Sequence, residues 1–122
     1  MTEHQKTIQN KFRKITESAR IVAAFEMEIR AEEERSQRSD SVSKKQHTKR
    51  IKELRKEMNQ YQQDVEVAKQ MIECLPEGLG KRILSMRYIQ LMRMEDIAAV
   101  LSYDRTYLYT VYYKALNDVQ QI

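Results

Sequence analysis

Between positions 51 and 75 the apolar residues recur at alternating steps of three and four, and this repeat most constrains the fold. A heptad repeat of this kind places its apolar side chains on one stripe of a helix. Pro76 and Gly78 end the pattern, because proline disfavours helical geometry in the residue before it. The sequence therefore predicts a long helix over residues 44–74, with an apolar stripe made of Ile51, Leu54, Met58, Tyr61, Val65, Ala68, Ile72 and Leu75.

A second long helix is predicted over residues 3–34. Thr2 and Gln5 fit a capping box at its start, and its apolar residues again step by three and four. Residues 35–43 include four serines and predict a loop, after which Ser43 and Gln46 fit another capping box. Two helices of matched length joined by a short loop favour an antiparallel hairpin, with each helix about 47 Å long at roughly 1.5 Å per residue. The first apolar stripe consists of Ile8, Phe12, Ile15, Ala19 and Val22.

The charges agree with an antiparallel coiled coil. The acidic run at 32–34 would lie beside a basic run at 44–56, which holds seven Lys or Arg and one Glu. The basic run has two interpretations: it pairs with the acidic run and is otherwise solvated, or it contacts DNA in addition to a surface in residues 76–122. Because a two-helix hairpin buries little on its own, we expect it to pair with a second copy or to pack on a C-terminal module formed by residues 76–122.

Composition supports an all-α protein, since 33% of the residues are charged and there are only two Gly and one Pro. Cys74 is the only cysteine, so no internal disulfide is expected, and two histidines make a zinc site implausible.

We find no phosphate-binding Gly-rich loop and no paired-carboxylate or nucleophile–base signature, so we expect neither an enzyme nor a cofactor. No stretch approaches twenty apolar residues, and we expect a soluble, cytoplasmic protein without a membrane partner.

From residue 79 onward the pattern changes to three short helices. The first ends near Gln90, and the second spans residues 94–101. A three-residue turn at 102–104 follows, with Asp104 well placed as the N-cap of the third helix. Two short helices across a tight turn, the second with an exposed polar face, predict a helix-turn-helix.

The motifs of this module resemble bacterial sigma factor region four. ILSMRYI at 83–89 is similar to its first helix, MEDIAAVL at 94–101 to the next, and DRTYLY at 104–109 to the start of the recognition helix. LPE at 75–77 and KAL at 114–116 also match, so the resemblance covers residues 75–117. Leu91 and Ser102 stand where the family usually has glycine, which is tolerable where the backbone avoids left-handed geometry. The layout of the whole chain is similar to small phage transcription regulators of the ArpU and RinA type.

Such a module implies a recognition helix in the major groove of double-stranded DNA. Arg105 is the best candidate for guanine contact, and Arg93 for the DNA backbone beside the preceding helix. Tyr112 lies on the apolar face and is expected to be structural. The predicted DNA-binding residues are Arg93, Arg105, Thr106, Tyr107, Tyr109, Thr110, Tyr113 and Lys114, with Asn117 on the same face.

Residues 76–122 carry six basic and five acidic groups, a net charge of +1, so this module alone should bind DNA weakly. We therefore predict an oligomerising hairpin at 1–75 and a DNA-binding module at 76–122. The predicted function is a sequence-specific, phage-encoded transcription regulator that acts with RNA polymerase as a homodimer or higher homo-oligomer. The alternatives are a small terminase subunit, which would form a ring of many copies, and a protein-binding adaptor or inhibitor of a host factor.

Overall fold

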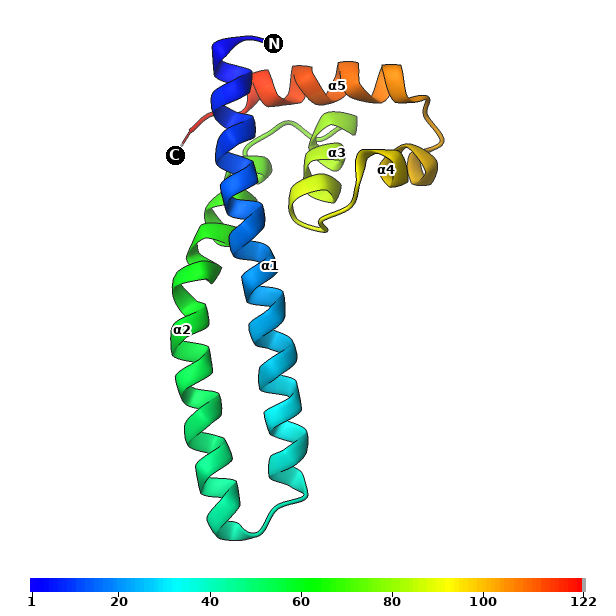
Figure 1. The fold of residues 1–122 in the computed structure, drawn as a ribbon. Coiled ribbons are helices and arrows are strands. Elements are labelled where there is room, and N and C mark those ends of the chain that lie inside the picture. The colour runs from blue at the N-terminus through cyan, green and yellow to red at the C-terminus, as the bar shows by residue number, and fades with distance from the viewer. Residues whose placement is uncertain (122) are drawn as a thin grey trace. The chain divides into compact units, whose positions relative to one another are not determined.

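The computed structural model describes residues 1–121, and these form five α-helices without a strand (Figure 1). The predicted all-α class is confirmed. Two long helices are followed by three short ones: α1 (Glu3–Gln37), α2 (Ser41–Glu73), α3 (Leu79–Tyr88), α4 (Met94–Leu101) and α5 (Arg105–Asp118).

The chain divides into two compact units, and each long helix contributes to both. Unit 1 consists of residues 1–17 and 65–122, and unit 2 of residues 18–64. The sequence predicted a single boundary at residue 75, and the observed units differ from this. The first turns of α1 pack with the C-terminal helices and therefore belong to unit 1. The aromatic rings of Phe12 and Tyr88 stack within unit 1, with centroids 4.6 Å apart.

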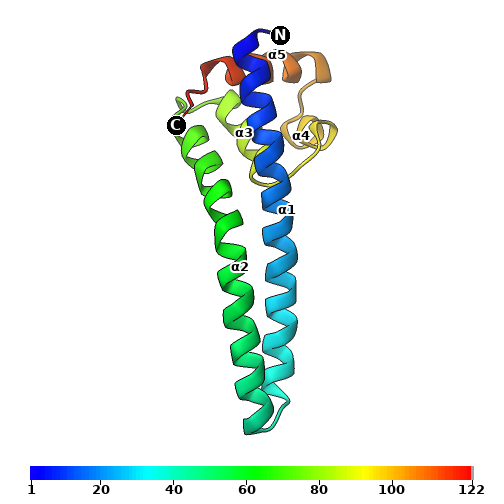
Figure 2. The ribbon, with the colours of Figure 1, turned by 60° about the vertical axis from the view of Figure 1, so that its left-hand side comes forward.

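In unit 2, α1 and α2 lie side by side (Figures 1 and 2). Ile29, Leu54 and Met58 form its small core, and Val22, Phe25 and Ile51 pack against them. Polar contacts cross between the helices in opposite order along the two segments, since Ser18 meets Asp64 whereas Glu32 meets His47. The expected proximity of the acidic and basic runs is also present, because Arg55 Nη2 lies 2.8 Å from Glu33 Oε1.

The connection between α1 and α2 is shorter than predicted. The loop expected at 35–43 is only residues 38–40, and the second capping box expected at Ser43 and Gln46 is not the start of α2. Asp40 caps that helix instead, because its Oδ1 accepts a hydrogen bond from the amide of Ser43 at 2.8 Å. The Ser39 hydroxyl donates to the carbonyl oxygen of Arg35 at 2.7 Å, so this serine stabilises the last turn of α1.

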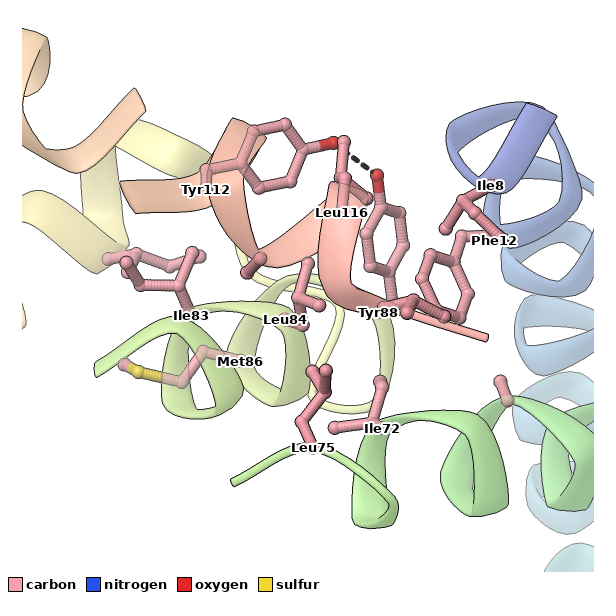
Figure 3. Close-up of a cluster of buried hydrophobic side chains, with 14 of the residues drawn as sticks. Ile8, Phe12, Ile72, Leu75, Ile83, Leu84, Met86, Tyr88, Tyr112 and Leu116 are labelled. Atoms are coloured by element: carbon pink, nitrogen blue, oxygen red, sulfur yellow. Dashed lines mark hydrogen bonds between the residues drawn. The ribbon is translucent and has the colours of Figure 1, made fainter. Parts of the chain in front are cut away.

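The larger core lies in unit 1, where apolar residues of all five helices meet (Figure 3). Ile8 and Phe12 of α1 are fully buried, as are Ile83 and Leu84 of α3. The predicted capping box at the start of α1 is confirmed, since the amide of Gln5 donates to Thr2 Oγ1 at 3.1 Å and that of Thr2 to Gln5 Oε1 at 2.6 Å. The other buried apolar residues of this core are Ile15, Ala68, Met71, Ile72, Leu75, Met86, Tyr88, Met94, Ile97, Ala98, Leu108, Tyr112, Ala115, Leu116 and Val119.

The connections on both sides of α4 contain left-handed residues. α3 ends at Tyr88 rather than at Gln90, and Leu91 then has a φ of 60°. Ser102, which follows α4, also has a φ of 60°. A left-handed conformation at these two positions was expected to be unfavourable because neither residue is glycine, and the backbone nevertheless adopts it at both.

Candidate nucleic-acid interface

Helix α5 has one buried and one exposed face. Leu108, Tyr112, Ala115 and Leu116 are buried, and Tyr112 is thereby confirmed as a core residue. At about 100° per residue the opposite side of the helix is centred on Thr106, Thr110, Tyr113 and Asn117. These four residues are exposed, so α5 has a polar face that is open to solvent.

The turn between α4 and α5 fixes the start of that face. The carboxylate of Asp104 accepts a hydrogen bond from the amide of Tyr107 at 3.0 Å, which confirms its predicted role as N-cap. The carbonyl oxygen of Asp104 accepts from the amide of Leu108, also at 3.0 Å. The cap therefore holds the backbone of Arg105 and Thr106 in the first turn of α5.

Five of the eight predicted site residues line one shallow hollow on unit 1: Arg105, Thr106, Tyr109, Thr110 and Tyr113. The Thr110 hydroxyl donates to the carbonyl oxygen of Thr106 at 3.0 Å, so its proton is already used within the helix. The rings of Tyr109 and Tyr113 lie against each other with centroids 5.9 Å apart. The hollow thus offers one guanidinium, two aromatic rings and two threonine side chains.

Tyr107 and Lys114 belong to a different part of the surface. Both line a separate groove with residues 75–81 and with Val111, Ala115 and Asp118. Tyr107 is 47% exposed, and its ring lies against that of Tyr103 with centroids 5.2 Å apart. The structure therefore does not bring these two residues into the hollow lined by Arg105.

Arg93 precedes α4 and is exposed, but its charge is engaged by two carboxylates in the first turn of that helix. Its Nη1 lies 3.0 Å from Glu95 Oε1, and its Nε lies 3.2 Å from Asp96 Oδ2. The two carboxylates favour the amide end of α4 through the helix dipole, and they repel a phosphate from the same place. Arg93 is consequently less suited to a DNA backbone contact than the sequence suggested. By contrast, Arg105 and Lys114 form no ion pair in the part of the chain that the structure describes.

A hydrogen-bonded pair of tyrosines joins the buried face of α5 to α3. The hydroxyls of Tyr88 in α3 and Tyr112 in α5 share a hydrogen bond (Figure 3). Gln9 of α1 donates from Nε2 to the Tyr112 hydroxyl at 3.1 Å. Burial raises the pKa of the Tyr88 hydroxyl well above its ordinary value, and the neighbouring Tyr112 adds to this. Tyr88 therefore stays neutral, and the pair is a structural support.

The first turn of α1 makes contacts with α5 that periodicity did not predict. Gln5 donates from Nε2 to the carbonyl oxygen of Tyr113 at 2.7 Å, and Thr2 Oγ1 donates to Asn117 Oδ1 at 3.4 Å. His4 Nε2 lies 2.6 Å from the carbonyl oxygen of Val119, which accepts its hydrogen bond. These contacts fix the second half of α5, and they engage the side-chain oxygen of Asn117 in a hydrogen bond. Their only sequence signal was the capping box, which does not predict a partner 108 or 115 residues away.

Two further properties of the described chain concern ligands. Within residues 1–121 no group of three or more His, Cys, Asp and Glu side chains is arranged to hold a metal ion. None of the helices described there combines the length and the apolar character needed to cross a membrane.

Comparison with protein-family models, with curated proteins and with solved structures finds no match to this chain. Its candidate site therefore has to be interpreted from the chemistry of its own residues.

Proposed function

We propose that this protein is a sequence-specific DNA-binding transcription regulator in which α4 and α5 act as a helix-turn-helix. The observation that carries the proposal is the exposed polar face of α5, where Arg105 and Thr106 stand beside Thr110, opposite a fully packed apolar face. A helix that enters the major groove needs both properties, since one face must be fixed to the protein while the other meets base edges.

The residues of the hollow suggest a division of roles. Arg105, free of ion pairs among residues 1–121, would donate two hydrogen bonds to guanine, a contact that discriminates between bases by about 1–3 kcal/mol. The hydroxyl of Thr110 donates its hydrogen bond to the helix backbone, so its methyl group would be the part that contacts thymine. The hydroxyls of Tyr109 and Tyr113 would donate to phosphates and position the helix.

The backbone of the connections supports the resemblance to sigma factor region four. Leu91 and Ser102 occupy the positions where that family usually has glycine, and both have the positive φ for which glycine is suited. A backbone course similar to that of the family, with other residues in place of its glycines, would account for both values. A phage-encoded regulator of the ArpU or RinA type remains the family that we propose on this basis.

The low net charge of residues 76–122 means that tight DNA binding would need further contacts from outside this module. Residues 76–122 have a net charge of +1, and Arg93 is engaged by Glu95 and Asp96. Since phosphate contacts supply most DNA affinity, we propose that the protein acts as a homodimer through the hairpin of α1 and α2, or together with RNA polymerase. Light scattering tests the first route: two copies support it, whereas a ring of many copies would favour a DNA-packaging subunit.

The experiment that tests DNA recognition is selection of bound duplexes from a random pool, repeated across a salt series. The proposal predicts an enriched motif that persists as salt rises, and a paired repeat if the protein is a dimer. Binding without any enriched motif, lost uniformly as salt is added, would contradict sequence-specific recognition.

A protein-binding module is the second candidate, and one observation favours it. Val100, Tyr103 and Tyr107 are all large and exposed, at 62%, 44% and 47%, around the turn between α4 and α5. Exposed tyrosines beside an aliphatic residue are common at protein interfaces. This candidate predicts no affinity for duplex DNA at low salt and no effect of Arg105→Ala on DNA binding.

A further inference from the structure

A stripe of four lysines runs along α2 in unit 2, and we propose that it is a second, sequence-independent contact site for the phosphate backbone of duplex DNA. The lysine stripe consists of Lys45, Lys49, Lys52 and Lys56, and all four are exposed. The proposal does not require α5 to bind DNA, because the stripe belongs to a different unit of the chain.

The spacing places these side chains on a single face. They follow one another at steps of four, three and four, so they fall within an arc of about 60° on a helix that turns about 100° per residue. At about 1.5 Å per residue the stripe is about 16 Å long. Leu54 and Met58 are buried on the opposite side of α2 against α1, so the lysines point away from the α1–α2 contact.

The two arginines of the basic run and the neighbouring His47 have a different role. Arg50 pairs with Glu28 at 3.2 Å and Arg55 with Glu33 at 2.8 Å. His47 hydrogen-bonds to Glu32 at 2.6 Å. These three residues flank the core and hold the two helices together. Within residues 1–121 none of the four stripe lysines forms an ion pair, so their charges are available to an anionic partner.

The surroundings of the stripe favour a duplex backbone over other polyanions. A single-stranded nucleic acid is bound through aromatic stacking. Tyr61 is the one Phe, Tyr or Trp of residues 41–64, and its half-buried ring packs against that of Phe25 with centroids 6.1 Å apart. Stable binding to a membrane surface combines cations with an apolar face or a lipid anchor, and Val42 is the only large exposed apolar side chain of residues 41–64. A straight row of unpaired point charges fits a regular phosphate backbone.

The salt dependence of binding to a duplex of random sequence tests the proposal on the full chain. The stripe variant carries Lys→Gln at 45, 49, 52 and 56. A control variant carries the same charge change at exposed positions outside the stripe, namely Lys14→Gln, Arg20→Gln, Lys69→Gln and Arg82→Gln. Glutamine has nearly the helix propensity of lysine, so both variants should keep the helical circular dichroism of the wild type.

Each phosphate contact contributes about 0.9 to the slope of log affinity against log salt concentration. We expect the stripe variant to lose about 3–4 from this slope and the control variant to lose less than about 1. A stripe variant that keeps the wild-type slope would overturn the proposal, and so would a control that loses as much. Lysine-dependent binding to phosphatidylserine vesicles, without binding to the duplex, would overturn it in favour of a membrane.

The result is distinguishable from failure of the function proposed for α5. Arg105→Ala in the otherwise wild-type chain leaves the stripe intact, so the slope on random duplex should stay within about 1 of the wild-type value. If no motif is enriched but the stripe variant still loses its slope, sequence recognition fails and the lysine stripe stands. If a motif is enriched and the slope is unchanged in the stripe variant, the opposite holds.

Discussion

The hydroxyl of Tyr112 in α5 is hydrogen-bonded to that of Tyr88 in α3, directly beneath the exposed face of α5. Tyr88 also stacks on Phe12 of α1, and Gln9 of α1 donates to Tyr112. Three helices are thus joined through one pair of tyrosines, which links the stability of unit 1 to the orientation of α5.

Tyr112→Phe should lower the free energy of unfolding by about 1–3 kcal/mol, because it leaves the buried Tyr88 hydroxyl and the Gln9 amide without their partner. Tyr88→Phe should cost less, since Tyr112 keeps its hydrogen bond from Gln9. Urea denaturation of the two variants and of the double variant measures this. The double variant should be more stable than the sum of the single effects predicts, and strict additivity would show that the hydroxyls do not interact.

Periodicity predicted the helices well, because burial on one face is a local property of the sequence. The stripes of α1 and α2, the buried face of α5 and the capping roles of Thr2 and Asp104 all follow from residues within a few turns of each other. The loop at 35–43 was predicted too long, because its four serines were interpreted as loop residues. Ser36 lies in α1, and Ser41 and Ser43 lie in α2, so only Ser39 belongs to the connection.

Partners distant in sequence were not predictable in this way. An apolar stripe on α1 has the same pattern whether it faces α2 or α3. Packing of the hairpin on the C-terminal module was one of two expectations, but the contact of Phe12 with Tyr88 and the resulting units were not predicted. The exposed face of α5 was predicted, but not that Tyr107 lines another groove. The engagement of Arg93 did have a signal, since Glu95 and Asp96 follow it in the first turn of α4.

Ser102→Gly should stabilise the protein by about 0.5–1 kcal/mol. The left-handed φ of 60° costs a residue with a Cβ about 1–2 kcal/mol, and glycine avoids this cost. Glycine also raises the entropy of the unfolded chain, which offsets part of the stabilisation. Thermal unfolding measures the change. Ser102→Ala is the matched control and should give no stabilisation, so an equal gain in both variants would mean that backbone strain is not the cause.

Gly80→Ala should destabilise unit 1 by about 1–2 kcal/mol through overpacking. A Cβ at position 80 would lie 2.9 Å from the Cβ of Ala115, so α3 and α5 would have to move apart. The substitution should cost less in an Ala115→Gly background, where that methyl group is absent. A double-mutant cycle from chemical denaturation gives the coupling, and equal costs in both backgrounds would refute the close approach.

Glu32→Gln should destabilise the protein at neutral pH but not in acid. Hydrogen bonding from His47, together with Arg35, holds the pKa of Glu32 below its ordinary value of 4.5. A carboxylate with a lowered pKa adds stability above that ordinary value and loses it as the pH falls through the lowered one. The difference in Tm between wild type and variant should therefore vanish at low pH. Glu34→Gln, at an exposed position without an ion pair in residues 1–121, should leave Tm unchanged, and a difference that persists in acid would contradict this role for Glu32.

The most direct test of DNA recognition by α5 is the affinity of Arg105→Ala for the duplex enriched by selection and for single-base variants of it. We predict a loss of about 1–3 kcal/mol on the enriched duplex and a loss of preference at one G·C pair only. Lys114 lies outside the hollow. Lys114→Ala removes a positive charge that attracts phosphates, so it should weaken binding to all these duplexes alike. If Arg105→Ala binds every duplex as tightly as the wild type, α5 does not read DNA and the proposed function is wrong.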